Sequence, residues 1–97
     1  DFNCMPSYTA SKSGVIGLTK WLSTKYASMG IIINCISPGG VFNNQTKTFV
    51  KKYSKINPSG KMANRDDLLG LINFLISDSS NYIVGQNIKI DGGHSTW

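Results

Sequence analysis

The apolar positions in the first third of the chain predict a long helix followed by a buried strand. Apolar side chains recur at three- and four-residue spacing from Tyr8 to Met29, as on one face of an α-helix, and we expect the helix over residues 11–29. Gly30 stands where a left-handed helix cap is expected. The nearly continuous β-branched run 31–36 then predicts a parallel strand that is covered on both faces. Proline and glycine at 38–40 end it.

The remainder of the chain predicts a helical excursion, a second long helix and a second strand. Residues 41–62 are polar and basic, and a weak helical pattern over 49–56 predicts one or two short helices. Asn64 and Asp67 have the spacing of a capping box, so a helix is expected over residues 66–77. A final strand is expected over residues 86–90. The helix over 66–77 should be well buried, because apolar residues cover much of its circumference: Leu68, Leu69, Leu71, Ile72, Phe74, Leu75 and Ile76.

This order of elements favours an α/β fold. Strands that alternate with helices indicate crossover units, so the two strands are expected to be parallel neighbours in one sheet. Two strands alone do not form a stable sheet of this kind. We therefore expect the sheet to continue in residues outside this sequence or in another chain.

Composition and cysteine content narrow the class of protein. The 97 residues are 40% hydrophobic and 15% charged, which is ordinary for a soluble globular protein. No apolar stretch is long enough to cross a bilayer. Cys4 and Cys35 lack metal-ligand spacing, so we expect no metal site and reduced thiols in a cytoplasmic protein.

The net charge of +5 comes with a local basic run. One interpretation of this charge is a nucleic-acid partner. The second is a solvated helix face, or a positive rim that attracts an anionic substrate. We favour the second interpretation, because no aromatic-interleaved basic motif or zinc spacing accompanies the charge, and we expect neither a nucleic acid nor a membrane as partner. The run consists of Lys47, Lys51, Lys52, Lys55 and Lys61.

Tyr8 and Lys12 are candidates for proton transfer. They stand four residues apart at the start of the first helix, so their side chains share a face. An ammonium beside a phenol favours the phenolate, and such a tyrosine can donate or accept a proton at a carbonyl or carbinol oxygen. Taken alone, the pair is weak evidence, because two exposed polar residues at a helix start would have the same spacing.

Three strings in a fixed order extend this evidence. They are residues 8–12 (YTASK), 34–41 (NCISPGGV) and 85–93 (GQNIKIDGG). Together they resemble the short-chain dehydrogenase/reductase family, over nearly the whole chain, with residues 42–62 the least matched. The resemblance implies that residues 1–97 form the carboxyl-terminal part of a single Rossmann-like domain, whose doubly wound parallel sheet is incomplete without an upstream half.

The resemblance also implies roles for site residues. Tyr8 is similar to the catalytic acid/base, and Lys12 to the residue that stabilises its phenolate and hydrogen-bonds the nicotinamide ribose, so both would contact the cofactor. The loop implied to flank the nicotinamide consists of Pro38, Gly39, Gly40 and Val41, with the Val41 amide facing the carboxamide. Small residues there let backbone approach a flat ring closely.

The implied activity is hydride transfer between NAD or NADP and a carbonyl or secondary alcohol. Substrates of the 3-oxoacyl type and of the sugar type both remain open, and the basic run favours an anionic or carrier-linked one. In this family the glycine-rich phosphate loop and the catalytic serine precede the tyrosine, so residues 1–97 alone are expected to be inactive. The alternative is a truncated, non-catalytic interaction or assembly module.

Small residues along the first helix bear on assembly. Ala10, Gly14 and Gly17 lie along part of it, while Val15, Leu18 and Leu22 can face the sheet. Glycine inside a helix costs about 1 kcal/mol relative to alanine, so something is expected to pack closely there. It could be a neighbouring helix of the same subunit. Relatives commonly pair this helix between subunits, with a second contact through the last strand and its preceding helix, which implies a homotetramer or homodimer.

Overall fold

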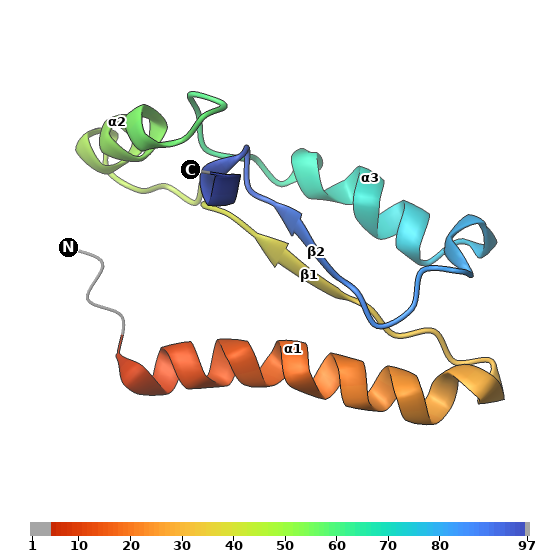
Figure 1. The fold of residues 1–97 in the computed structure, drawn as a ribbon. Coiled ribbons are helices and arrows are strands. Elements are labelled where there is room, and N and C mark those ends of the chain that lie inside the picture. The colour runs from red at the N-terminus through yellow and green to blue at the C-terminus, as the bar shows by residue number, and fades with distance from the viewer. Residues whose placement is uncertain (1–4, 97) are drawn as a thin grey trace. The chain divides into compact units, whose positions relative to one another are not determined.

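The computed structural model describes residues 5–96, so Cys4 lies outside the described residues. Their contacts divide the chain into two compact units. The first contains the residues up to Cys35 together with Asn81–Asn87, and the second contains Ile36–Ser80 together with the residues from Ile88 onward. Figure 1 shows the elements, which in chain order are α1 (Pro6–Tyr26), η1 (Ala27–Met29), β1 (Cys35–Pro38), α2 (Lys47–Ile56), α3 (Asp66–Leu75), η2 (Asp78–Ser80), β2 (Asn87–Ile90) and η3 (His94–Thr96).

In the first unit, α1 begins five residues before the predicted start of the helix, with Pro6 in its first turn. Proline suits this position, because its fixed φ is already helical and the missing N–H has no partner there in any helix. At the other end η1 continues the helix to Met29, and Gly30 follows with a φ of 81°. The predicted left-handed cap at Gly30 is therefore confirmed.

The predicted strand over residues 31–36 is wrong in its first four positions, and the strand ends at Pro38, two residues later than predicted. β1 begins only at Cys35, whose N–H donates to the Gln86 carbonyl at 2.8 Å. Ile31 and Ile32 are 49% and 36% exposed, so they are also not buried as predicted. Their β-branched side chains favour extended backbone, but a strand also needs a partner, and β2 begins only at Asn87.

Hydrogen bonds from polar side chains hold the segment before β1 in place. The Ile33 carbonyl accepts hydrogen bonds from the buried Ser23 hydroxyl at 2.8 Å and from the Gly85 amide at 2.9 Å. Asn34 donates from Nδ2 to the Ile83 carbonyl at 2.8 Å, and its Oδ1 accepts from the Gln86 amide at 3.0 Å. One asparagine thus supplies both a donor and an acceptor that a strand would have supplied from its backbone.

The two strands are parallel neighbours, as predicted (Figure 1). Their register is given by two hydrogen bonds, from Cys35 N to Gln86 O and from Gly39 N to Ile90 O, each 2.8 Å long. Both partners advance by four residues in the same direction between these bonds, which is the arrangement of a parallel ladder. The carboxyl ends of both strands therefore lie at one edge of the sheet.

Both helices of the second unit have side-chain hydrogen bonds at their amino-terminal ends, of which the sequence predicted the one before α3. The Thr46 hydroxyl accepts from the Phe49 amide at 3.2 Å and caps α2, which confirms a short helix in the excursion. Before α3, Asn64 N donates to Asp67 Oδ2 at 2.8 Å and Asp67 N donates to Asn64 Oδ1 at 3.3 Å. This reciprocal pair is the predicted capping box. At its other end α3 stops at Leu75, two residues before the predicted end at Ser77.

The predicted burial of α3 is wrong for the described residues. Leu69, Ile72 and Phe74 are 50%, 38% and 40% exposed, and no apolar side chain within residues 5–96 is buried. On α1, Val15 and Leu18 are exposed as well, although the sequence allowed them to face the sheet. The apolar pattern correctly predicted the helices, but it indicates only which of their faces avoid water and not what covers those faces.

Within residues 5–96, no helix combines the length and apolar character needed to cross a membrane.

Candidate functional site

Tyr8 and Lys12 lie one turn apart near the start of α1, in the first unit. The Lys12 ammonium is 5.5 Å from the centre of the Tyr8 ring, so the two side chains share a face as predicted. Tyr8 is 54% exposed and Lys12 is exposed, which leaves both open to a ligand. This geometry places the positive charge of Lys12 over the ring of Tyr8.

Ser11, between these residues, takes no part in the pair. Its hydroxyl donates to the Tyr8 carbonyl at 2.9 Å, which is the local side-chain-to-backbone bond common for serine in helices. A hydroxyl directed at the helix backbone does not polarise a carbonyl substrate next to the phenol. The serine that the family resemblance implies is therefore not Ser11.

The loop of residues 38–41 belongs to the second unit, where its backbone is held on two sides. Gly39 N donates to the Ile90 carbonyl at the end of β2, at 2.8 Å. On the other side Val41 forms a parallel bridge with Ala63, in which Ala63 N donates to Gly40 O at 2.9 Å and Phe42 N donates to Ala63 O at 2.7 Å. The loop is thus fixed between the end of β2 and the segment that leads into α3.

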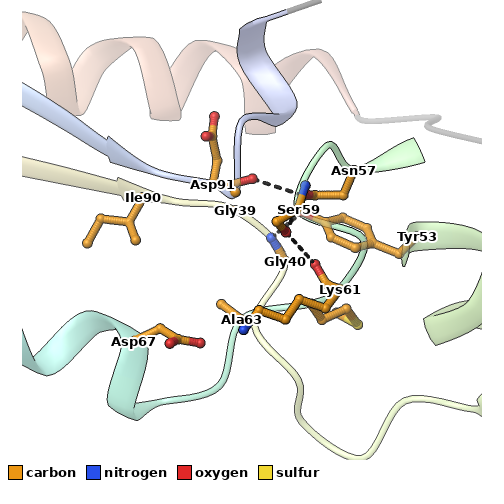
Figure 2. Close-up of a pocket in the computed structure, with 12 residues that line it drawn as sticks. Gly39, Gly40, Tyr53, Asn57, Ser59, Lys61, Ala63, Asp67, Ile90 and Asp91 are labelled. Atoms are coloured by element: carbon orange, nitrogen blue, oxygen red, sulfur yellow. Dashed lines mark hydrogen bonds between the residues drawn. The ribbon is translucent and has the colours of Figure 1, made fainter. Parts of the chain in front are cut away.

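Tyr53 of α2 lies directly against this loop (Figure 2). Its hydroxyl accepts a hydrogen bond from the Gly40 amide at 2.6 Å. A Cβ atom on Gly40 would lie 2.6 Å from Cζ of Tyr53, and one on Gly39 would lie 2.9 Å from Cα of Asp91 and 3.1 Å from the Tyr53 hydroxyl. The flat ring that approaches these glycines in this structure is therefore a side chain of the protein itself. Sequence reasoning missed Tyr53, whose only signal was an aromatic residue within a lysine-rich helix.

Asn57, just after α2, joins Tyr53 to the end of β2. It is 5% exposed, and its Nδ2 donates to the Asp91 carbonyl at 2.9 Å and more weakly to the Tyr53 hydroxyl at 3.5 Å. Its Oδ1 accepts from the amide and the hydroxyl of Ser59 at 3.0 and 2.7 Å. The buried amide is therefore satisfied at both ends, which makes it a rigid link.

Asp91 and His94 complete this region at the carboxyl end of β2. Hydrogen bonds from the Ser95 side chain and from the Gly93 and Ser95 amides, with the nearby charge of Lys89, hold the pKa of Asp91 below its ordinary value. His94 stacks on the Tyr53 ring with the ring centres 6.0 Å apart. It is exposed and supports the aromatic side chain next to the glycine loop.

A cavity of about 260 Å³ lies beside the loop in the second unit. Gly39, Gly40 and Tyr53 form part of its wall, and Lys61 and Asp67 add charge to the lining. The predicted basic residues of α2 are all exposed, as is Lys61, so they form an open positive surface rather than ion pairs within the core. Among residues 5–96, no group of three or more histidine, cysteine or acidic side chains could hold a metal ion.

Comparison with known proteins gives the family. The family model described as enoyl-(acyl carrier protein) reductase matches residues 2–95. The chain is 39% identical over 96 residues to a 2-dehydro-3-deoxy-D-gluconate 5-dehydrogenase of Escherichia coli, covering 92% of this chain and 38% of that protein. It is 38% identical over 92 residues to a 3-oxoacyl-(acyl-carrier-protein) reductase of Buchnera aphidicola, covering 90% and 37%. The chain thus spans less than two fifths of the length of these relatives.

Solved structures agree in fold. A short-chain dehydrogenase from Leptospira borgpetersenii with bound NAD+ superposes with a TM-score of 0.88 at 46% identity, covering 93% of this chain and 35% of that one. A gluconate 5-dehydrogenase from Burkholderia cenocepacia, in complex with NADP and tartrate, also gives 0.88, at 29% identity, covering 96% and 39%. These matches confirm the predicted α/β class, with the parallel strands as part of a Rossmann-like sheet. The chain belongs to the short-chain dehydrogenase/reductase family.

Proposed function

We propose that this chain supplies the catalytic tyrosine of an oxidoreductase that transfers hydride between NAD or NADP and a carbonyl or secondary alcohol. The observation that carries the proposal is the Lys12 ammonium 5.5 Å from the centre of the Tyr8 ring, in a chain of this family. Relatives named as dehydrogenases and reductases support it, as do the neighbours solved with NAD+ and with NADP. The complete enzyme would contain these residues together with a nucleotide-binding half.

Each residue has a defined task in this proposal. The Tyr8 hydroxyl donates its proton to the carbonyl oxygen in reduction, and the phenolate takes the proton from the alcohol in oxidation. Lys12 stabilises the phenolate and donates to the ribose hydroxyls, and its exposed ammonium has three donors for this purpose. The backbone of residues 38–41 flanks the nicotinamide, which supplies or accepts the hydride when the cofactor is bound.

The substrate in this proposal is a 3-oxoacyl compound or an oxidised sugar. Relatives with both kinds of name support the two classes equally. The open basic surface of α2 and Lys61 favours an anionic or carrier-linked member of either class.

The test is oxidation of NADH and NADPH by the complete enzyme with a 3-oxoacyl thioester and with a keto-sugar acid. We expect turnover with one of the two classes, and a KM that rises with salt because charge attracts the substrate. The isolated 97-residue chain serves as the control and should oxidise neither cofactor. Turnover with neither class, in a complete protein that is folded, would favour the alternative of a non-catalytic assembly module.

We also propose that the complete enzyme is a homo-oligomer, most simply a tetramer, with α1 at a two-fold axis. A Cβ atom on Gly14 or Gly17 would meet nothing within 4 Å in this structure, so no described residue accounts for these glycines. Gly17→Trp should shift the assembly toward smaller species in sedimentation, whereas Lys52→Trp on the exposed face of α2 should leave it unchanged. A parent protein that sediments as a monomer at micromolar concentration would refute the proposal.

A further inference from the structure

We propose that Tyr53 is the positioning residue of the glycine loop: its ring fills the space that side chains at 39 and 40 would need, and its hydroxyl fixes the Gly40 amide. The steric part concerns only the fold of the second unit. The consequence for cofactor binding rests on the function proposed above.

The steric part follows from three distances. A Cβ atom on Gly40 would lie 2.6, 2.8 and 3.0 Å from Cζ, Cε2 and the hydroxyl oxygen of Tyr53. Carbon atoms in van der Waals contact stand about 3.5–4.0 Å apart, so alanine at position 40 requires the ring or the loop to move. The proposal therefore assigns to Tyr53 the steric requirement for glycine at position 40.

Two other aromatic rings lie next to the Tyr53 ring. Phe49, one turn earlier on α2, stacks with its ring centre 6.4 Å away, and His94 stacks at 6.0 Å. Displacing the ring would disturb these two aromatic contacts as well as its bond to Gly40. The loop thus packs against a ring that these aromatic contacts hold in position.

The hydroxyl adds a directional contact. The Gly40 amide donates to it at 2.6 Å, and Asn57 links the same hydroxyl to the Asp91 carbonyl. The Gly39 amide donates a hydrogen bond to the carbonyl of Ile90, the residue before Asp91. The loop, the end of α2 and the end of β2 therefore form a closed chain of contacts, so a shift of α2 shifts the backbone at Gly40.

The steric part is tested by a double-mutant cycle in the complete protein without cofactor. Gly40→Ala should lower the Tm by about 4–8 °C, because the added methyl overpacks the site. In a Tyr53→Ala background the same substitution should lower it by less than about half as much. Gly70→Ala is the matched control, since its Cβ would meet nothing within 4 Å. Equal shifts from Gly40→Ala in the two backgrounds would overturn the proposal.

The positioning part is tested by Tyr53→Phe, which keeps the ring and removes only the hydroxyl. Leaving the Gly40 amide without its acceptor should raise the dissociation constant for NAD(P)H by about 5- to 10-fold, with kcat at saturating cofactor within about 2-fold of the parent. Tyr82→Phe makes the same change at a fully exposed tyrosine and should alter neither value. An unchanged dissociation constant in Tyr53→Phe would overturn this part. If the parent binds neither NADH nor NADPH, the proposed function has failed, and the positioning part fails with it, while the double-mutant cycle still decides the steric part.

Discussion

Replacement of Tyr8 by phenylalanine is expected to lower kcat for carbonyl reduction by about 10²–10⁴-fold in the complete enzyme. The hydroxyl acts only as the proton moves, so its loss removes an interaction made in the transition state and leaves ground-state binding intact. The phenyl ring remains beneath the Lys12 ammonium, which keeps this contact of the helix start in place. The dissociation constant for the cofactor should accordingly change by less than about 2-fold.

The same helix provides a matched control for this substitution. Tyr26, the last residue of α1, also has a lysine ammonium over its ring, that of Lys25 at 5.4 Å. Tyr26→Phe therefore removes the same atoms from the same kind of contact, at the far end of the helix. Stopped-flow or steady-state measurement of NAD(P)H oxidation should separate the two variants by about two orders of magnitude or more. Near-parental turnover in Tyr8→Phe would end the assignment of Tyr8 as the acid/base.

Lys12→Ala is expected to impair both turnover and cofactor binding. Loss of the ammonium removes the charge that favours the phenolate, so kcat should fall by about 10²-fold or more. It also removes the donors proposed for the ribose hydroxyls, so the dissociation constant for the cofactor should rise about 10-fold. The paired loss distinguishes Lys12 from Tyr8, whose substitution should affect kcat alone.

Lys25→Ala is the control for this prediction. Lys25 lies over the rings of Trp21 and Tyr26 on the same helix, at 5.1 and 5.4 Å, so its removal deletes comparable contacts without touching the proposed site. Equilibrium titration of each variant with NAD(P)H, followed by cofactor fluorescence, measures the dissociation constant for the cofactor. A Lys12→Ala enzyme with parental cofactor affinity would show that Lys12 has no role in holding the cofactor.

Features with local causes could be predicted from the sequence. The cap at Gly30 and the Asn64–Asp67 box each depend on residues within three or four positions, and both are present. The Tyr8–Lys12 pair was predictable for the same reason, because helical spacing alone brings them together. Parallel pairing of β1 and β2 followed from the alternation of element types.

Features that depend on a distant partner could not be predicted. Ile31 and Ile32 favour a strand, but among the described residues the pairing of β1 with β2 begins only at Cys35. The contact between Tyr53 and Gly40 joins residues 13 positions apart across a turn whose course the sequence does not define. The sequence predicted close approach of the nicotinamide to Gly39 and Gly40, but its pattern could not reveal that the Tyr53 ring of α2 also lies against them.

The side chain of Asn34 is a position at which deamidation would change the structure. Deamidation of asparagine replaces the amide nitrogen by oxygen, and at Asn34 that nitrogen donates to the Ile83 carbonyl at 2.8 Å. The carboxylate that results is only an acceptor, so two oxygens would face each other where a hydrogen bond had been. The Gln86 amide would keep its acceptor, while the link to Ile83 would open. Deamidation at Asn34 would thus loosen the chain ahead of β1, at a residue outside the proposed site.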